Sequence, residues 1–272
     1  MALDIRAICI LALAPWEPAI AQSLARRVAA APDGKVEFSF ASRPGVCGDG
    51  KGVIGDGRHF MMMHGNGFSI SDGDDEDDDD YIRNCPCEPG PVRVSLRVRS
   101  HEVDDVSTFV GPLPSTARTG VTDLGTVDVK SATNYLLGVA RQGDSDLGHD
   151  AIFPATLADS VVVWPELLKI ARDESVARDT RQSAVFWVSQ AAGDAATRGL
   201  DSLVSDEKGD RDIREHAVFA LSQRPKEEGV PILIRIAKTN KDPEIRRRAL
   251  FWLGQSDDPR ALALFEEILT KR

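Results

Sequence analysis

The chain has 272 residues, which allows one large domain or two small ones. Its composition, 42% apolar and 28% charged, is typical of globular proteins and excludes wholesale disorder. No run of 18 apolar residues occurs, so the sequence predicts no membrane insertion. The net charge of −10 argues against nucleic acid as a general partner.

Most of the excess acid lies in one segment. Residues 72–80 read DGDDEDDDD, and without these eight acids the other 263 residues carry a net charge of only −2. We interpret the run as a solvated, mobile loop inside an insertion over residues 48–86. Calcium binding is the alternative, although the run lacks the ligand order and the sixth-position glycine of the twelve-residue calcium loop.

The N-terminus has the features of a secretory signal peptide. Residues 7–14 (AICILALA) form an apolar core after Arg6, and Ala19–Ala21 has the small-x-small pattern of a cleavage site. The sequence therefore predicts cleavage after Ala21 and a periplasmic or secreted protein. The alternative is the first helix of a cytosolic protein, ended by Pro15 and Pro18.

Cysteine usage agrees with export. Cys9 lies in the predicted signal, which leaves Cys47, Cys85 and Cys87 in the mature chain. We expect a disulfide between Cys47 and either Cys85 or Cys87, with Cys87 as the first choice, at the base of the insertion. The third cysteine is either free or an alternative partner. Three cysteines meet the four-ligand need of structural zinc poorly, so we expect no metal there.

Residues 22–128 are predicted to form a small β-rich segment. Apolar and polar residues alternate in 35–41 and 91–100, which places the arginines 93, 97 and 99 outward, and 103–110 can pair back on the second strand. Three or four strands are close to the lower limit for a stable core. We therefore expect the segment to pack on the C-terminal part of the chain or to depend on the disulfide.

From Val129 to the C-terminus the chain reads as helical and repeats itself. A first helix is expected from a cap at Ser131 through Gln142. Three segments then align without gaps at offsets of 33 and 32: 178–190, 211–223 and 243–255. Each is followed by a second amphipathic stretch, at 196–204, 229–237 and 259–269. A more degenerate unit precedes them, with helices expected at Ala151–Ser160 and from Trp164.

This period, with two helices per unit, predicts an α-solenoid of about four helical pairs. The fold class is therefore mainly α, with the helical domain over 129–272, the regular repeats over 178–272, and the small β-rich segment before them. The small Ala184, Ala217 and Ala249 are expected where helices approach closely. Asp210 and Asp242 are placed as N-caps.

The shared core Arg-x-x-Ala-x-x-x-[Val/Leu]-x-Gln and the Asp-Pro-Glu-Ile-Arg start at Asp242 resemble the HEAT-like repeat family, including the short units of phycobilin lyases. The resemblance covers about residues 145–272. It implies a helical-repeat fold, and a function among scaffolds, regulators and a minority of lyases. The whole arrangement also resembles bacterial exported proteins that carry a β-rich leader before such repeats.

Two repeated features suggest sites. The arginines at 181, 214 and 246 could bind an acidic partner, but we favour ion pairs to an acid at the neighbouring turn. The aromatic row of Phe186, Trp187, Phe219, Phe251 and Trp252 is predicted to be buried between repeats. An exposed binding stripe is the alternative.

The sequence gives catalysis and metals little support. The five histidines are scattered, and no common catalytic motif or phosphate-binding loop occurs. His59 and His64, which flank three methionines, would lie on opposite faces of a strand, so copper is not favoured. The glycine-rich residues 45–57 lack the spacing of a phosphate cradle. We therefore expect no cofactor.

These features predict a non-catalytic module of the cell envelope or secreted space that binds a protein or peptide through the solenoid surface. The candidate contacts are the polar positions of the second helices: Glu166, Lys169, Arg198, Asp201, Arg235 and Lys238. The alternatives are a HEAT-like lyase or another enzyme with an unrecognised site, and a calcium-responsive protein that uses the acidic run.

Overall fold

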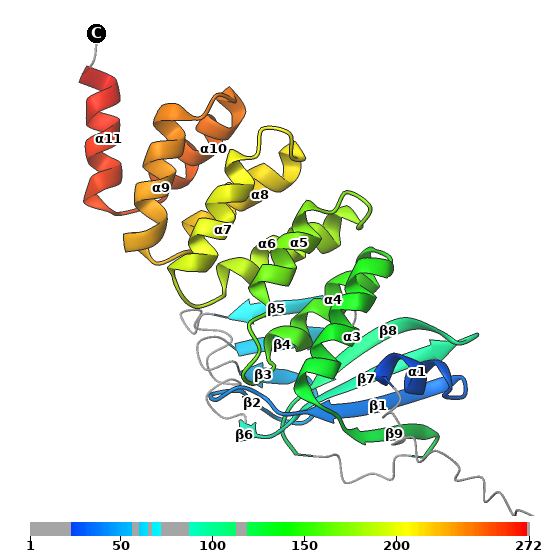
Figure 1. Cartoon of the computed structure of the whole chain (residues 1–272). Coiled ribbons are helices and arrows are strands. Elements are labelled where there is room, and N and C mark those ends of the chain that lie inside the picture. The colour runs from blue at the N-terminus through cyan, green and yellow to red at the C-terminus, as the bar shows by residue number, and fades with distance from the viewer. Residues whose placement is uncertain (1–22, 56–59, 65–66, 72–86, 113–118, 271–272) are drawn as a thin grey trace, which may run out of the picture.

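A computed structural model describes residues 23–55, 60–64, 67–71, 87–112 and 119–270, with the backbone alone for 60–64 and 67–71 (Figure 1). The predicted signal peptide, the acidic run, His59 and Cys85 lie outside these residues, so the predictions made for them stay predictions.

The elements follow the expected order of strands and then helices. The β-rich part contains α1 (Leu24–Ala29), β1 (Gly34–Phe40), β2 (Cys47–Gly48), β3 (Val53–Gly55), β4 (Phe60–His64), β5 (Gly67–Ser71), β6 (Glu88–Pro89), β7 (Val92–Arg99), β8 (Glu102–Phe109) and β9 (Val121–Thr126). The helical part contains α3 (Val129–Gln142), α4 (Ser145–Thr156), α5 (Trp164–Arg172), α6 (Arg178–Ser189), α7 (Asp194–Ser205), α8 (Arg211–Ser222), α9 (Lys226–Thr239), α10 (Pro243–Gly254) and α11 (Pro259–Thr270).

The first sheet has the strand order β8-β7-β1-β9, in which β1 is antiparallel to β7 and parallel to β9. As the alternation predicts, Val36, Phe38 and Phe40 of β1 point into the core and are buried. Arg93 of β7 was expected to be exposed, but it is buried on the other face of the sheet. Its guanidinium donates to the Gly50 carbonyl at 3.3 Å and lies over the Phe109 ring.

A second sheet, with the order β5-β4-β3-β2-β6, lies within and beside the predicted insertion. The expectation of three or four strands was therefore wrong, because the described residues form nine strands in two sheets. The strands that were not predicted are two to six residues long: β2 to β6 in the second sheet and β9 at the edge of the first. In segments this short an alternation of apolar and polar residues spans too few positions to be distinctive, which is why the sequence pattern missed them.

The two sheets meet where two backbone segments cross at very short distance. A Cβ atom on Gly48 would lie 2.5 Å from the Val110 carbonyl oxygen, and one on Gly50 would lie 2.0 Å from that of Pro112. Gly50 also adopts a φ of +76°, which side chains disfavour. These glycines are therefore explained by packing rather than by a bound phosphate.

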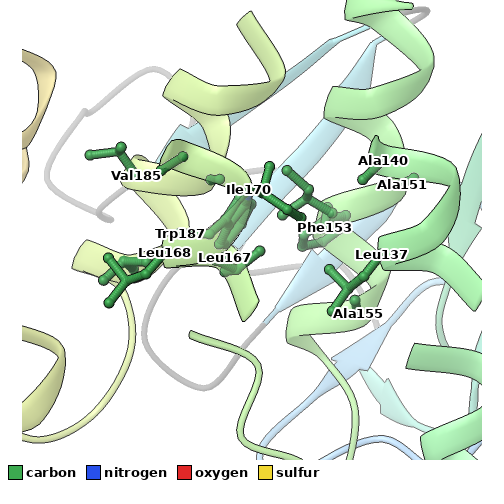
Figure 2. Packing of buried hydrophobic residues seen from close by; sticks show 14 of the residues in the cluster. Leu137, Ala140, Ala151, Phe153, Ala155, Leu167, Leu168, Ile170, Val185 and Trp187 are labelled. Carbon is green, nitrogen blue, oxygen red and sulfur yellow. The ribbon is translucent and has the colours of Figure 1, made fainter. Parts of the chain in front are cut away.

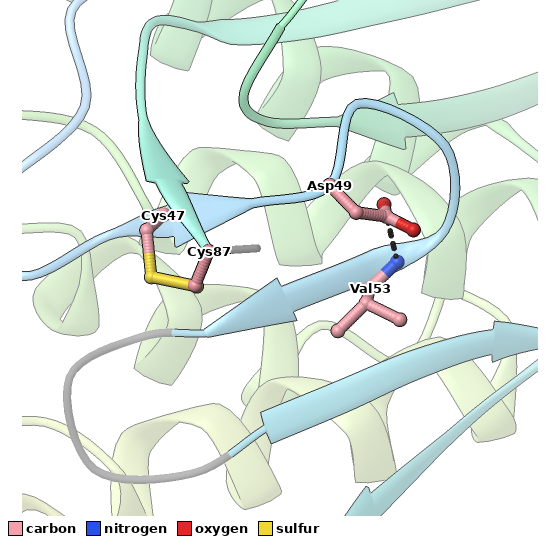
Figure 3. The surroundings of a disulfide bond; sticks show 4 residues. All are labelled: Cys47, Asp49, Val53 and Cys87. Carbon is pink, nitrogen blue, oxygen red and sulfur yellow. Dashed lines mark hydrogen bonds between the residues drawn. A yellow bond between two sulfur atoms is a disulfide. The ribbon is translucent and has the colours of Figure 1, made fainter. Parts of the chain in front are cut away.

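A disulfide joins Cys47 of β2 to Cys87, next to β6, across 40 residues of chain (Figure 3). On the other side of β2, the Asp49 carboxylate accepts hydrogen bonds from the backbone N–H groups of Lys51, Gly52 and Val53, which fixes the turn into β3. Together they connect β2 to its two neighbours in the second sheet, β6 and β3.

The first sheet and the helices share one hydrophobic core, which runs without interruption from Leu24 to Leu264. The Phe38 ring of β1 meets the edge of the Tyr135 ring of α3, with centroids 6.1 Å apart, and β8 packs against α4. The β-rich part therefore packs on the helical part, as its small size predicts.

The helices form two layers that extend away from the sheet (Figure 1). We name α4, α6, α8 and α10 the A layer, and α5, α7, α9 and α11 the B layer. Neighbours within each layer contact one another, and α3 packs beside α4 at the sheet end. Phe153 of α4 stacks on Trp187 of α6 with centroids 5.3 Å apart, in the core drawn in Figure 2. Ala184, Ala217 and Ala249 are fully buried.

The regular repeat helices were predicted correctly, but two predictions near the sheet were wrong. The helix expected at Ala151–Ser160 is α4, which begins at Ser145 and ends at Thr156. It cannot continue to Ser160, because that residue adopts a φ of 54°. The cap of α3 is Asp128 and not Ser131, since the Asp128 carboxylate accepts from both the backbone N–H and the hydroxyl of Ser131.

Candidate functional site

The repeated arginines tie consecutive repeats together. The buried Arg181 of α6 donates through Nε to the Ala171 carbonyl at 3.1 Å, and its Nη1 lies 2.9 Å from the Asp210 carboxylate. Arg214 of α8 repeats both contacts one unit further, with Val204 and Asp242. Each arginine therefore satisfies the C-terminus of one B-layer helix and pairs with the N-cap of the next A-layer helix.

These contacts support the interpretation of the arginines as structural. Burial alone would raise the pKa of Asp210, but hydrogen bonds from Arg181 and from the Asp212 backbone N–H outweigh it and lower the pKa. The pair is therefore charged at neutral pH. Arg246 of α10 differs from the other two, because within the described residues it donates only to the carbonyls of Asn240 and Lys241.

Arg224 is a second structural arginine that the sequence analysis missed. It is buried after α8 and donates to the carbonyls of Ser189 at 2.7 Å and Gly193 at 3.0 Å, and it pairs with Glu228 at 2.9 Å. The positions that align with it are Ala191 and Ser256. No repeated pattern could therefore have identified it.

The six predicted contact residues lie on the B layer, two each on α5, α7 and α9. Three of them link successive B-layer helices. Asp201 of α7 pairs with Arg235 of α9, and Lys238 of α9 pairs with Glu267 of α11 at 2.6 Å. Lys169 and Arg141 both donate to Glu166, at 2.6 and 3.0 Å, while Arg198 pairs with Asp194 within α7. A role for this face in binding a partner stays a prediction.

The aromatic row divides between core and surface. Trp187 is buried, whereas Phe186, Phe219 and Trp252 are half-buried and Phe251 is 53% exposed. The rings of Phe219 and Trp252 lie 4.8 Å apart between α8 and α10, and Phe251 contacts the edge of Trp252. The aligned tryptophans thus differ, since Trp187 nearer the sheet is buried and Trp252 further along the array is half-buried.

The half-buried rings of Phe219 and Trp252 form the floor of an open groove of about 390 Å³ on the A layer. Its lining comes from three consecutive helices, with Gln182 from α6, Asp212, Glu215, His216 and Phe219 from α8, and Arg248 and Trp252 from α10. His216 is half-buried against the Phe219 ring, and burial lowers the pKa of its imidazole. We name this feature the A-layer groove.

Charged pairs form the rim of the groove. Arg248 donates to Glu215 through Nε at 3.0 Å and has its Nη2 2.9 Å from the same oxygen. Asp212 pairs with the exposed Arg178 of α6 at 2.9 Å. The groove therefore combines an aromatic floor with carboxylates, a combination that suits recognition of a polar or cationic group.

The structure brings no obvious catalytic or metal centre together in the residues that it describes. No three His, Cys, Asp or Glu side chains within the described ranges lie close enough to hold a metal ion. His101 lies in the turn between β7 and β8, His149 on α4 and His216 on α8, so the helical part does not gather them.

Comparison with known families identifies the repeats. Residues 200–272 match the family model for HEAT repeats. The match begins within α7 and includes α8 to α11, and the same two-layer packing continues back to α4. No curated protein matches the chain significantly. None of the helices in the described ranges has the length and apolarity that crossing a membrane requires.

Proposed function

We propose that this chain is a non-catalytic module that binds a protein partner through the surface of its HEAT repeats. HEAT repeats generally act as scaffolds for protein interaction, and stacked repeats present extended binding surfaces. The observation that carries the proposal is the A-layer groove, where aromatic rings remain partly open to solvent across consecutive units. An aromatic cluster inside a polar rim is the usual composition of an interaction site.

We further propose that the protein works in an oxidising compartment, as an exported protein cut after Ala21. The Cys47–Cys87 disulfide and the apolar residues 7–14 support this location. The mass of the protein purified from its natural source is the test. Export predicts an N-terminus at Gln22 and a disulfide between Cys47 and Cys87, and an intact N-terminus with reduced cysteines would contradict it.

The binding proposal is tested by affinity capture with matched surface variants. A truncation that removes the helices is unsuitable, because the sheet shares its core with them. The full chain is compared with Asp212→Arg in the A-layer groove and with a double variant on the opposite layer, Arg235→Glu with Lys238→Glu. All of these positions are at the surface, so each variant is expected to keep the circular dichroism spectrum of the parent.

We expect a partner from an envelope extract to be retained by the parent and the B-layer variant and lost by Asp212→Arg. Loss with the B-layer variant alone would assign binding to the six residues predicted from the sequence. A partner retained by all three proteins, or no partner at all, would overturn the proposal. Attention would then move to the β-rich part and the acidic run.

A further inference from the structure

The floor of the A-layer groove offers aromatic faces to a ligand. The ring centroids of Phe219 and Trp252 lie 4.8 Å apart and both side chains are half-buried, although Trp252 aligns with Trp187, which is buried nearer the sheet. Indole and phenyl faces carry negative electrostatic potential and attract cations placed over them. The floor therefore favours a cation over an anion.

The charges in the lining lead to the same preference. Two carboxylates and one guanidinium line the groove, which leaves an excess of one negative charge. Glu215 is held by two N–H groups of Arg248 and is not available. Among the described residues, the carboxylate of Asp212 has one side-chain partner, the guanidinium of Arg178, whose side chain is largely exposed. A surface pair of this kind contributes little, so an incoming cation can replace Arg178 at low cost.

The two remaining polar side chains also admit a cation. His216 is buried enough to lower the pKa of its imidazole, so it is neutral at pH 7 and adds no positive charge. The Gln182 amide makes no hydrogen bond to other described residues and can offer its oxygen as an acceptor. A guanidinium or ammonium group would therefore find both a carboxylate and an amide oxygen.

We propose that the A-layer groove binds a basic side chain of the protein partner, over the rings of Phe219 and Trp252 and against the carboxylate of Asp212. This inference rests on the proposed function and names the chemistry of the partner. The site suits arginine best, because a planar guanidinium can stack on a ring while its N–H groups donate to Asp212 and Gln182.

The test is a titration of the full chain, labelled with ¹⁵N, with a synthetic pentapeptide that has one arginine between glycines. The indole N–H signal of Trp252 is assigned by its loss in Trp252→Phe. We expect this signal to shift and saturate. The same peptide with citrulline, which has nearly the same shape but no charge, is expected to bind about tenfold more weakly or not at all.

Two substitutions separate the groove from general electrostatics. Asp212→Asn is expected to weaken arginine-peptide binding about five- to tenfold. Glu207→Gln removes another ion-paired surface carboxylate, which is more exposed than Asp212 and pairs with Lys241 outside the groove, and it is expected to leave binding unchanged. Equal shifts with citrulline, equal losses in both variants, or no shift of the Trp252 signal would overturn the inference. Because this test uses a defined peptide, its result is independent of whether the capture experiment finds a partner.

Discussion

The repeated arginines show how one residue can set the spacing of an array. Arg181 joins α5, α6 and α8, Arg214 joins α7, α8 and α10, and both side chains are almost completely buried. This role could be predicted because the same arginine recurs at a fixed offset. Each copy is followed by an acid, Asp210 or Asp242, immediately before the next A-layer helix. The aromatic floor of the A-layer groove belongs to the row for which an exposed stripe was the alternative, but the polar lining could not be predicted in this way. His216 aligns with Ser183 and Arg248, so no repeated chemistry indicated it.

The first prediction concerns Arg181. Arg181→Met keeps most of the side-chain volume but removes the hydrogen bond to the Ala171 carbonyl and the ion pair with Asp210. We expect the free energy of unfolding to fall by about 2–4 kcal/mol in urea titrations. The control is Arg211→Met, whose exposed side chain pairs with Asp242 at 3.2 Å and whose loss is expected to cost less than about 1 kcal/mol. Equal losses in the two variants would contradict the structural role of Arg181.

A second prediction concerns Asp150 of α4, which lies near the edge strand β8. Burial, followed by repulsion from Asp105, Asp146 and Asp144, raises the pKa of Asp150 to about 7. The folded state therefore binds a proton more tightly than the unfolded chain. The contribution of this group to stability is complete below about pH 4 and is lost as the pH rises through about 7.

Asp150→Asn should remove that loss. Relative to the parent, we expect the variant to gain about 1–2 kcal/mol at pH 8, a value reduced for the partial solvation of the carboxyl, and to gain nothing at pH 4. Urea unfolding at the two pH values measures the difference. A gain of the same size at both pH values would show that packing, and not ionisation, distinguishes the variant.

At the scale of elements, the accuracy of prediction followed the regularity of the sequence. The helices from α6 onward could be predicted because three copies of one pattern superimpose without gaps. α4 was misplaced because it carries Pro154 within the helix and lacks the repeated arginine and glutamine, so only its partner α5 could be aligned. The second sheet was missed because its strands are short and because β2 and β6, which lie beside the disulfide, pair across about 40 residues of chain.

The disulfide gives the third prediction. Closing a loop of 40 residues is expected to stabilise the folded chain by about 4 kcal/mol in the chain-entropy model. Replacing both Cys47 and Cys87 with serine should therefore lower the thermal midpoint clearly. Cys85→Ser keeps both cysteines of the Cys47–Cys87 bridge, so it is the matched control and should leave the midpoint unchanged. A loss with Cys85→Ser as large as with the double variant would show that Cys85 takes part in the bridge.

At the scale of the whole molecule, burial decreases along the array. α6 buries eight of its side chains between neighbours, whereas α11 buries only Ala261 and Leu264 and exposes Leu262, Ile268 and Leu269. Repeat proteins are stabilised by contacts between adjacent units, so a helix with few such contacts opens on its own.

The fourth prediction rests on this gradient. In hydrogen exchange measured by mass spectrometry, we expect amides of α11 to exchange at least about a hundredfold faster than those of α6 in the intact chain. α8 lies between them and provides an internal reference. Uniform protection from α4 to α11 would show that the array unfolds only as one unit.

The sheet that covers the first helices also affects where in the array repeats can be gained or lost during evolution. Its β8 packs against α4 where a preceding unit would stack, so we expect copies of the repeat to be gained or lost more easily on the far side. The unit beside the sheet must fit two different neighbours, whereas later units need only fit one another. Gene duplication and deletion would therefore act on the distal units, where the three segments still align without a gap, and leave the first unit to diverge with the sheet.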